Sequence, residues 1–484
     1  MGPKDVIPMT LLDRLGGRQA IRQGVEDTFR PLSRHPHPSH GEALTCKDYA
    51  AFLREKLGGN PVEDSVHNLL CPLPATPGRE GRPRLILQGH MDMVCAAAGD
   101  FQPERDPVTI VAKDGFLRSD GRSSLGADNG LGNAAVLWLL STGQVAHGPL
   151  TLLFTTAEEV GLAGAKEVDP AWLAGSDYLL NTDGFHLGRA IVGSASGRRE
   201  TWSRPLELEP APPLPAWRLT LSGGLGGHSG DDIHRGRGNP IKLLSGYLAG
   251  LPSGRIAELS GGLTHNAIPA WAEAVVFAPE EPDLTLLQNA LELYRQADPG
   301  LTATCAPAEG PEEVWTATFQ AHVLAFLNGL YHGVYTMDPA FPGVVGASAN
   351  LGKAGATEGA FQVCSFLRSA RREEEQELAH RHEALAAAHG FTGTVTGYPG
   401  WPGERNNPLA AVLDRVWRAQ TGRGLDIGAV HVGLEPSVFQ DKCPALVMAS
   451  TGPDILDAHS VDERAPLDTL PDYVLLLAGT LEAL

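Results

Sequence analysis

The sequence predicts an α/β fold, with a mixed, mostly parallel sheet in one domain and an inserted α+β domain. Three observations predict it. Hydrophobic runs typical of strands, Leu85–Leu87 and Leu150–Phe154, lie on either side of a helix-like segment at Leu131–Leu140. This alternation of strand and helix favours parallel pairing. The pattern changes after about residue 200, and strand and helix alternate again from about residue 408.

The first 200 residues contain the first group of expected elements. Residues 8 to about 60 are expected to form helices, with Met9–Leu12 opening one and Tyr49–Leu53 lying in another. Leu131–Leu140 carries apolar residues on most faces, which indicates a buried helix. Tyr178–Leu180 is a further short apolar run typical of a strand.

The middle of the chain has a different character. The proline-rich stretch Pro210–Pro215 is typical of a boundary. Trp217–Leu221 alternates like a half-exposed strand, and Ile241–Leu251 predicts a helix. A long charged helix is predicted over Arg372–His389, and it should end before Gly390, because glycine is favoured just beyond a helix C-terminus.

The composition breaks again around Tyr398–Gly403. Beyond it we expect a helix at Leu409–Gln420, a strand at Ala445–Met448 and a terminal helix from Pro471. The two breaks predict a discontinuous domain of residues 1–200 and 400–484, and an inserted domain of residues 205–395.

Composition excludes several classes of partner. The net charge of −19 argues against nucleic acid and against anionic membrane surfaces. The six cysteines are scattered without a C-x-x-C pair, so we expect reduced thiols. Met1–Asp5 lacks the apolar segment of a signal peptide, and no apolar run approaches the ~20 residues that span a bilayer. A cytoplasmic protein is expected.

Carboxylates and histidines gather near the ends of the predicted strands. In open α/β sheets ligands lie beyond the carboxyl ends of the strands, and imidazole with carboxylate is a ligand set for zinc. Each segment alone is more typical of a turn or a solvated surface, but together they predict a two-zinc hydrolase site. The segments are Gly89–Asp92, Gly126–Gly130, Thr155–Glu159, Asn181–Asp183 and Asp457–Ser460.

One assignment gives each of the two metal ions one histidine and one carboxylate, with a further carboxylate shared between them. His90 and Asp183 bind one zinc ion, and Glu159 and His459 bind the other. Asp128 bridges the two, because a pair of close metal ions needs one shared carboxylate. The three carboxylates then offset most of the +4 charge of two zinc ions.

Two further acidic residues have different predicted roles. Asp92 follows His90 by two residues and is placed to accept the second ring N–H, which fixes the imidazole tautomer. Glu158 precedes Glu159 in an irregular loop, so the two side chains should diverge. We therefore expect Glu158 to be the general base that accepts a proton from the attacking water.

The motifs resemble a known family. The order G-H-M-D-M, L-G-A-D-N-G, T-A-E-E-V-G, N-T-D and A-H-S-x-D-E-R is similar to that of the bacterial aminoacyl-histidine dipeptidases of the peptidase D type, within the aminoacylase and carboxypeptidase group of two-zinc peptidases. The resemblance implies two Zn²⁺ ions (with Mn²⁺ or Co²⁺ as substitutes), an α/β catalytic domain, an inserted lid and the same ligand roles. It extends through Gly227–His234, Gly238–Asn239, Asn266–Pro269, Tyr398–Trp401 and His431–Glu435.

The chain also departs from the family pattern. Val192–Gly197 stands where the family has a small glycine-rich segment after the Asp183 motif. Pro436-Ser437 stands where the family tends to Cys-Gly. These changes bear on the preferred substrate side chain.

Four residues are candidates for contact with substrate. His228 lies among glycines. This pattern alone is typical of an exposed turn residue, whereas the resemblance implies a lid histidine that donates a hydrogen bond to the oxyanion. Arg368 is interpreted equally well as a surface ion pair or as a clamp for a substrate carboxylate. Glu435 would bind the free α-amino group or brace the pocket, and Asn239 is assigned to substrate binding on the resemblance.

The predicted activity is that of a metal-dependent dipeptidase acting on Xaa-His-type or broadly unspecific dipeptides. The alternatives are an N-acyl amino-acid deacylase and, from another class, a non-catalytic metal-binding or peptide-binding protein. The expected partner is a dipeptide substrate. Monomer and homodimer stay open, and so does the supply of His228 from the same chain or from a dimer partner.

Overall fold

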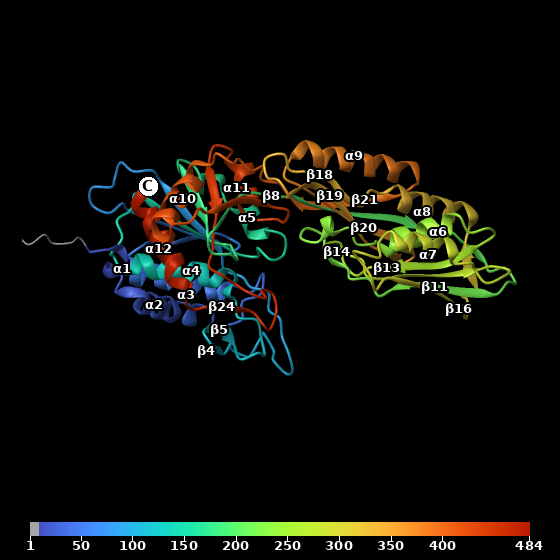
Figure 1. Cartoon of the computed structure of the whole chain (residues 1–484), viewed down its shortest axis with the longest axis horizontal. Coiled ribbons are helices and arrows are strands. Elements are labelled where there is room, and N and C mark those ends of the chain that lie inside the picture. The colour runs from blue at the N-terminus through green and yellow to red at the C-terminus, as the bar shows by residue number, and fades with distance from the viewer. Residues whose placement is uncertain (1–8) are drawn as a thin grey trace, which may run out of the picture. The chain divides into compact units, whose positions relative to one another are not determined.

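The computed structural model describes residues 9–484, so the N-terminal segment used for the localisation prediction and the first residue of the expected helical region lie outside the described residues. The chain forms two compact units. The first comprises the chain up to Gly193, Trp401–Ala429 and Leu434–Leu484, and the second comprises Ser194–Gly400 and Val430–Gly433. Figure 1 shows the elements of each unit.

The first unit contains an eight-stranded mixed sheet with the order β1-β2-β6-β3-β7-β23-β8-β22. At its centre β3 pairs in parallel with β6 and β7, and β7 pairs in parallel with β23. Every residue of β3 is buried, as expected for a strand covered on both faces. The predicted mixed, mostly parallel sheet is confirmed. The strands are β1 (Val62–Glu63), β2 (Leu69–Leu73), β3 (Leu85–His90), β6 (Leu150–Thr155), β7 (Tyr178–Asn181), β8 (Arg189–Ser194), β22 (Asp426–Val430) and β23 (Val447–Ser450).

Helices and a small sheet complete the first unit. Helix α4 packs against β3 and α2, and α12 packs against α2, α4 and α10. Helix α4 begins four residues before the predicted Leu131, and its Asp128 has non-helical backbone angles. The helices are α1 (Leu11–Arg14), α2 (Gly17–Leu32), α3 (Ala43–Leu57), α4 (Ala127–Ser141), α5 (Ala163–Glu167), α10 (Pro408–Thr421), α11 (Pro436–Lys442) and α12 (Leu470–Ala483), and the small sheet is β4 (Ile110–Lys113), β5 (Phe116–Ser119) and β24 (Arg464–Pro466).

The second unit contains a nine-stranded sheet with the order β16-β11-β15-β13-β19-β20-β9-β21, with β18 paired to β19. Its neighbouring strands pair antiparallel, so the unit is of the α+β kind. The strands are β9 (Gly197–Pro205), β11 (Ala216–Ser222), β13 (Arg255–Gly261), β15 (Ala272–Phe277), β16 (Thr302–Ala308), β18 (Gly333–Met337), β19 (Val345–Thr357), β20 (Ala360–Ser369) and β21 (Thr392–Tyr398), and two short pairs are β10 (Leu208–Pro210) with β17 (Glu313–Trp315) and β12 (Gly227–His228) with β14 (Ala267–Ile268).

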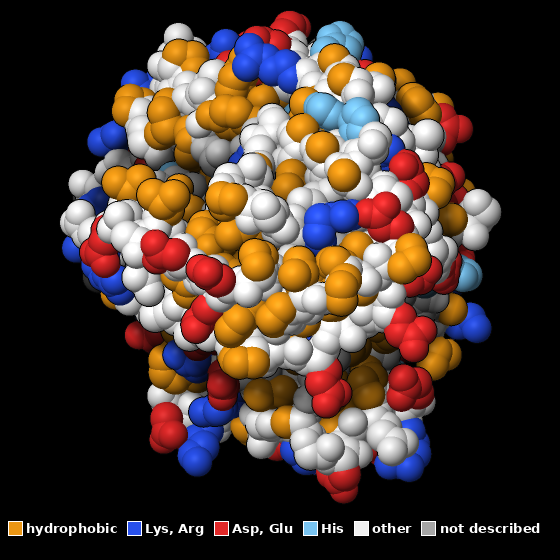
Figure 2. Space-filling view, turned by 90° about the vertical axis from the view of Figure 1, so that its right-hand side faces the viewer, with side chains coloured by type: hydrophobic (Ala, Val, Ile, Leu, Met, Phe, Trp, Pro, Cys, Tyr) orange, Lys and Arg blue, Asp and Glu red, His pale blue; other side chains and the backbone are white. Residues whose placement is uncertain are grey.

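Four helices cover this sheet: α6 (Pro240–Ala249), α7 (Thr285–Glu292), α8 (Ala317–Gly329) and α9 (Arg372–Ala388). One apolar core joins α6, α7 and α8 to the strands. The predicted charged helix is confirmed as α9, and Gly390 beyond it has a left-handed φ of 70°. Figure 2 shows a face on which hydrophobic side chains lie interspersed with acidic and basic ones.

Two further sequence expectations concern thiols and membranes. The six cysteines are all free thiols, as their scattered spacing predicts. Within residues 9–484, helices long and apolar enough to cross a membrane are absent.

Candidate metal centre

The central strands of the first unit end where the predicted ligands begin. His90 is the last residue of β3, and Thr155 and Asn181 end β6 and β7. Because β3 is parallel to both neighbours, these ends lie at one edge of the sheet, and the loops beyond them carry Glu158, Glu159 and Asp183. The sheet therefore supplies three of the five predicted ligands from a single edge.

The other two predicted ligands come from more distant segments of the same unit. Asp128 lies at the start of α4, after a glycine with left-handed φ, and its peptide bond to Asn129 is cis. His459 lies in the loop between β23 and β24 and also has a positive φ, 64°. Its side chain is 46% exposed, whereas those of His90 and Asp128 are almost fully buried.

Asp128 contacts both histidines. Its Oδ1 lies 3.1 Å from Nε2 of His90, and its Oδ2 lies 2.9 Å from Nε2 of His459. Nε2 of His459 is also 3.0 Å from Oε1 of Glu159, and Nε2 of His90 is 3.9 Å from Oδ1 of Asp183. The five side chains thus converge, with each oxygen of Asp128 facing a different histidine.

Asp92 lies on the other side of the His90 ring. Nδ1 of His90 is 3.4 Å from the Asp92 carboxylate and 2.9 Å from the Asp92 backbone oxygen. The Asp92 carboxylate also accepts hydrogen bonds from the backbone N–H groups of Glu158 and Glu159, at 2.9 Å and 3.1 Å, and from the Ser39 hydroxyl. Asp92 therefore fixes both the imidazole and the backbone of the Glu158–Glu159 pair.

The charged forms of Glu158 and Asp183 are disfavoured by burial and by neighbouring carboxylates. Burial raises the pKa of Glu158 well above its usual value, and the neighbouring charges of Asp183 and Glu159 raise it further. Burial and the charge of Asp128 likewise raise the pKa of Asp183 well above its usual value. Such a set of buried carboxylates is costly without a compensating positive charge.

The pKa values of the two histidines are also raised, which for an imidazole favours the charged form. Hydrogen bonds to Asp128 and Glu159 raise the pKa of His459 to about 11. Burial alone would lower the pKa of His90, but the hydrogen bonds to Asp128 and Asp92 outweigh it and raise that pKa well above its usual value. Two imidazoles and three carboxylates in contact are a donor set that divalent cations prefer, and ligand atoms of His90, Asp128 and Glu159 lie within 4.8 Å of one another.

Glu463 is a residue of this unit to which the sequence analysis assigns no role. It is buried, and its carboxylate accepts hydrogen bonds from the backbone N–H groups of Leu125, Gly126 and Asp128, at 2.8, 3.0 and 3.2 Å. It thereby holds the segment that carries Asp128. Its position in the A-H-S-x-D-E-R motif, four residues after His459, is the signal that could have drawn attention to it.

Glu435 is also fully buried in the first unit. It accepts hydrogen bonds from the Gln88 side chain of β3 at 2.5 Å and from the Thr155 hydroxyl of β6 at 2.8 Å. Burial raises its pKa to about 7. These contacts correspond to the bracing alternative, and binding of a substrate amino group by Glu435 stays a prediction.

His228 and Arg368 lie together in the second unit. Nε2 of His228 is 3.2 Å from Nη2 of Arg368, and Nδ1 of His228 is 3.2 Å from the carboxylate of Asp231. Arg368 also donates to the Ser229 hydroxyl and the Tyr398 hydroxyl. Its side chain is only 3% exposed, so the surface ion-pair interpretation of Arg368 is wrong.

His431 also lies near Arg368, and the sequence patterns predict no role for it. His431 is buried, its Nε2 lies 2.7 Å from the Ser348 hydroxyl, and burial with the nearby charge of Arg368 lowers its pKa to about 3.

Asn239 caps α6 in the second unit. Its side-chain oxygen accepts hydrogen bonds from the backbone N–H groups of Ile241 and Lys242, and its NH₂ donates to the Leu351 carbonyl. A substrate contact by Asn239 stays a prediction.

Comparison with known proteins finds a family profile that matches most of this chain and a relative that matches nearly all of it. The profile of peptidase family M20/M25/M40 matches residues 86–483. The cytosol non-specific dipeptidase of Escherichia coli (strain K12) is 30% identical over 479 residues, which cover 96% of this chain and 98% of the relative.

Solved structures with the same fold are also found. Aminoacylhistidine dipeptidase from Vibrio alginolyticus superposes with a TM-score of 0.82 at 29% identity, over 95% of this chain and 96% of that one. Aminopeptidase PepT from Bacillus cereus ATCC 10987 shares the fold, with a TM-score of 0.56 at 16% identity over 96% of this chain and 98% of that one.

Proposed function

Because the chain belongs to peptidase family M20/M25/M40, we propose that it is a metal-dependent dipeptidase that uses two Zn²⁺ ions. The observation that carries the proposal is the contact of Asp128 with both His90 and His459. A carboxylate with one oxygen facing each of two imidazoles is suited to bridge two cations. In this assignment His90 and Asp183 would hold one ion, and Glu159 and His459 would hold the other.

Glu158 is the proposed general base. When bound, the metal ions polarise the scissile carbonyl and lower the pKa of water. Glu158 is held by its backbone hydrogen bond to Asp92, while its carboxylate occupies a site where burial raises its pKa. That environment favours acceptance of a proton from water, and the same carboxyl group then delivers the proton to the leaving amine.

The proposed substrate is a dipeptide with a free carboxylate. Among residues 9–484, ion pairs between Arg368 and a carboxylate are absent, and the buried guanidinium donates to neutral groups instead. The charge of Arg368 lowers the pKa of Asp231, but no carboxylate among the described residues lies at ion-pair distance from the guanidinium. This supports the clamp interpretation, since a planar guanidinium pairs well with a carboxylate. His228, at 3.2 Å from Arg368, is the proposed oxyanion donor.

The names of the relatives support both predicted specificities. One is called a cytosol non-specific dipeptidase and the other an aminoacylhistidine dipeptidase. We propose that this chain hydrolyses dipeptides of Xaa-His type or more broadly, in the cytoplasm. Pro436-Ser437 replaces the Cys-Gly of the resembling family, so this chain's side-chain preference should differ from theirs.

Metal removal and reloading test the function. We expect chelation to abolish hydrolysis of a dipeptide panel that includes Xaa-His, and Zn²⁺, Mn²⁺ or Co²⁺ to restore it. His90→Ala should lower metal content, measured by elemental analysis, while the surface variant Asp472→Asn should not. Purified protein that hydrolyses dipeptides at full rate without bound transition metal would overturn the assignment.

Two comparisons separate the alternatives. An N-acyl amino-acid deacylase would cleave N-acetylated substrates as well as free dipeptides, so the rate ratio between a dipeptide and its N-acetyl form decides between them. A non-catalytic binding protein would bind dipeptides without turnover in every metal form. Sedimentation measures whether the chain is a homodimer, which the sequence analysis leaves open.

A further inference from the structure

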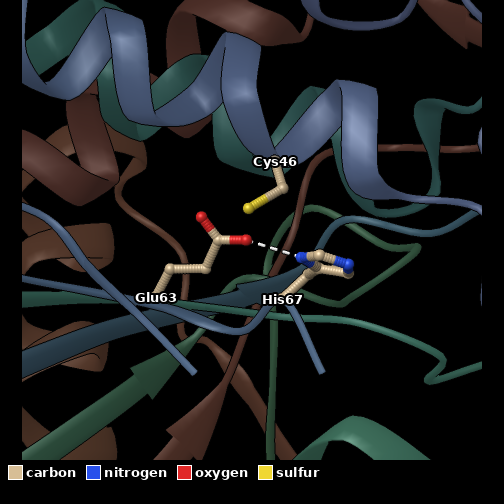
Figure 3. Close-up of side chains that lie close together, drawn as sticks. All are labelled: Cys46, Glu63 and His67. Carbon is tan, nitrogen blue, oxygen red and sulfur yellow. Dashed lines mark hydrogen bonds and ion pairs between the residues drawn. The ribbon is translucent and has the colours of Figure 1, made fainter. Parts of the chain in front are cut away.

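A second group of metal-ligating side chains lies elsewhere in the first unit. Cys46 of α3, Glu63 of β1 and His67 of the following loop each offer one ligand atom, and these atoms all lie within 4.8 Å of one another. Figure 3 shows the thiol, the carboxylate and the imidazole pointing toward a common point from the helix on one side and the hairpin on the other. The three residues lie outside the five segments that carry the predicted zinc ligands.

The backbone of the hairpin is firmly held. Strand β1 pairs with β2 through Val62↔Leu70 and Glu63↔Leu69. In the connecting loop the Asp64 carboxylate accepts hydrogen bonds from the backbone N–H groups of Val66 and Asn68, at 2.9 Å each. This pattern is typical of an Asx turn and fixes the loop that carries His67.

His67 adopts an uncommon conformation within this loop. Its φ is 71°, a left-handed value that side chains other than glycine rarely take. That backbone turns the imidazole back toward β1, and Nδ1 of His67 lies 2.5 Å from Oε1 of Glu63. The hairpin thus brings His67 and Glu63 next to the thiol of Cys46, which is a buried residue of α3.

The distances suit a metal after a small adjustment. Zinc binds sulfur at about 2.3 Å and nitrogen or oxygen at about 2.0–2.2 Å, which puts tetrahedral ligand atoms roughly 3.4–3.6 Å apart. Glu63 and His67 are closer than this and would separate by about 1 Å. Their side chains are 43% and 45% exposed and free to make this shift, whereas Cys46 is fully buried.

The side chains around the Cys46 thiol carry negative charge. Burial, together with the nearby carboxylates of Glu63, Asp64 and Glu42, raises the pKa of Cys46 to about 12. The metal-free thiol is therefore neutral, and a cation that binds here displaces its proton. The same carboxylates that oppose a bare thiolate would attract a divalent cation.

We propose that Cys46, Glu63 and His67 form a third metal site, for one thiophilic divalent cation of the Zn²⁺ type, with water as the fourth ligand. Sulfur, nitrogen and oxygen in a tetrahedral set favour Zn²⁺ over Mg²⁺ or Ca²⁺, which prefer oxygen ligands alone. The exposed side of Glu63 and His67 leaves the fourth position open to solvent.

Cobalt gives this site a signal of its own. The ligands proposed for the two-metal centre are nitrogen and oxygen only, so thiolate-to-Co²⁺ charge-transfer absorption in the near ultraviolet reports on a cysteine ligand. The experiment titrates Co²⁺ into the chelator-treated full chain under a non-thiol reductant, and records both the absorption band and the bound metal per chain.

We expect the band in the wild type and its loss in Cys46→Ala, with one equivalent less of bound Co²⁺. Cys443→Ser, a partly exposed cysteine elsewhere in the same unit, is the matched control and should keep both. His67→Ala alters an exposed residue and should leave the fold intact while weakening Co²⁺ binding at this site at least about 100-fold, since loss of a ligand should cost no less than loss of an outer-shell partner.

Three results would overturn the proposal. The first is a wild type without a thiolate band, and the second is a band that persists in Cys46→Ala. The third is a His67→Ala variant with unchanged Co²⁺ affinity at this site, which would leave the histidine as a hydrogen-bond partner of Glu63 only. None of these results depends on whether the enzyme hydrolyses dipeptides.

Discussion

Glu463 provides a test of how the chain positions Asp128. Its carboxylate accepts three backbone hydrogen bonds from the segment Leu125–Asp128, and it makes no contact with the histidines of the centre among the described hydrogen bonds. Glu463→Ala removes the acceptor and leaves three buried N–H groups without a partner. The prediction is a loss of stability and of metal affinity together.

The size of the effect follows from these three bonds. Each buried donor left unpaired costs roughly 1–3 kcal/mol, and water entering the vacated space recovers part of it. At about 1 kcal/mol each, the loss is about 3 kcal/mol, which corresponds to a decrease in Tm of roughly 6–12 °C for a unit of this size. Loss of a group that orients a metal ligand should also weaken metal binding about 10–100-fold.

Calorimetric unfolding and competition with a chromophoric chelator measure the two quantities. Glu463→Gln keeps one carbonyl oxygen as an acceptor and should lose less in both assays than Glu463→Ala. The control Asp472→Asn removes an exposed ion pair with Arg18, which is worth at most about 1 kcal/mol. Unchanged metal affinity in Glu463→Ala, with the expected fall in Tm, would show that the segment does not need Glu463 to place Asp128.

Four further outcomes are expected. Glu158→Gln should lower kcat by roughly 10²–10⁴-fold and keep the metal, and loss of metal instead would exchange its role with that of Glu159. Arg368→Lys should raise KM for dipeptides more than for their C-terminal amides, and an equal rise for both would reject the clamp. His228→Ala should lower kcat about 10²–10³-fold with little change in KM, and activity restored on mixing with Glu158→Gln would indicate supply across a dimer. The pKa of about 11 at His459 keeps it protonated at pH 7 in the metal-free protein, so metal binding should release protons and weaken as the pH falls; equal binding heats in buffers of different ionisation enthalpy would contradict this.

Local patterns predicted the strand ends well. The apolar runs that end at β3, β6 and β7 are short and are followed at once by polar residues, so both the strands and their loops could be recognised. The helix over Arg372–His389 was equally clear, because a glycine marks its end. The predicted strand Ala445–Met448 is two residues early, since β23 covers Val447–Ser450.

Structural features that depend on residues far apart in the sequence could not be predicted from local patterns. Strand β19 runs for 13 residues through Val345–Thr357, but its glycines and alanines lack the large or β-branched side chains that mark strands, so the sequence patterns do not reveal it. Glu463 gains its role from N–H groups more than 300 residues earlier in the chain. The Cys46, Glu63 and His67 cluster likewise depends on a helix meeting a hairpin, which sequence spacing does not reveal.

The position of β23 has a consequence for how the chain emerges during synthesis. It lies beside β7 in the middle of the first unit's sheet, yet it follows β7 by about 270 residues, because the second unit comes between them. At about 5–20 residues per second, roughly 13–50 s pass after β7 is made before β23 is available. Until then β7 is an unpaired edge beside a cluster of mutually repelling carboxylates, so the nascent chain should depend on chaperones during this interval and then complete the sheet in a single late step.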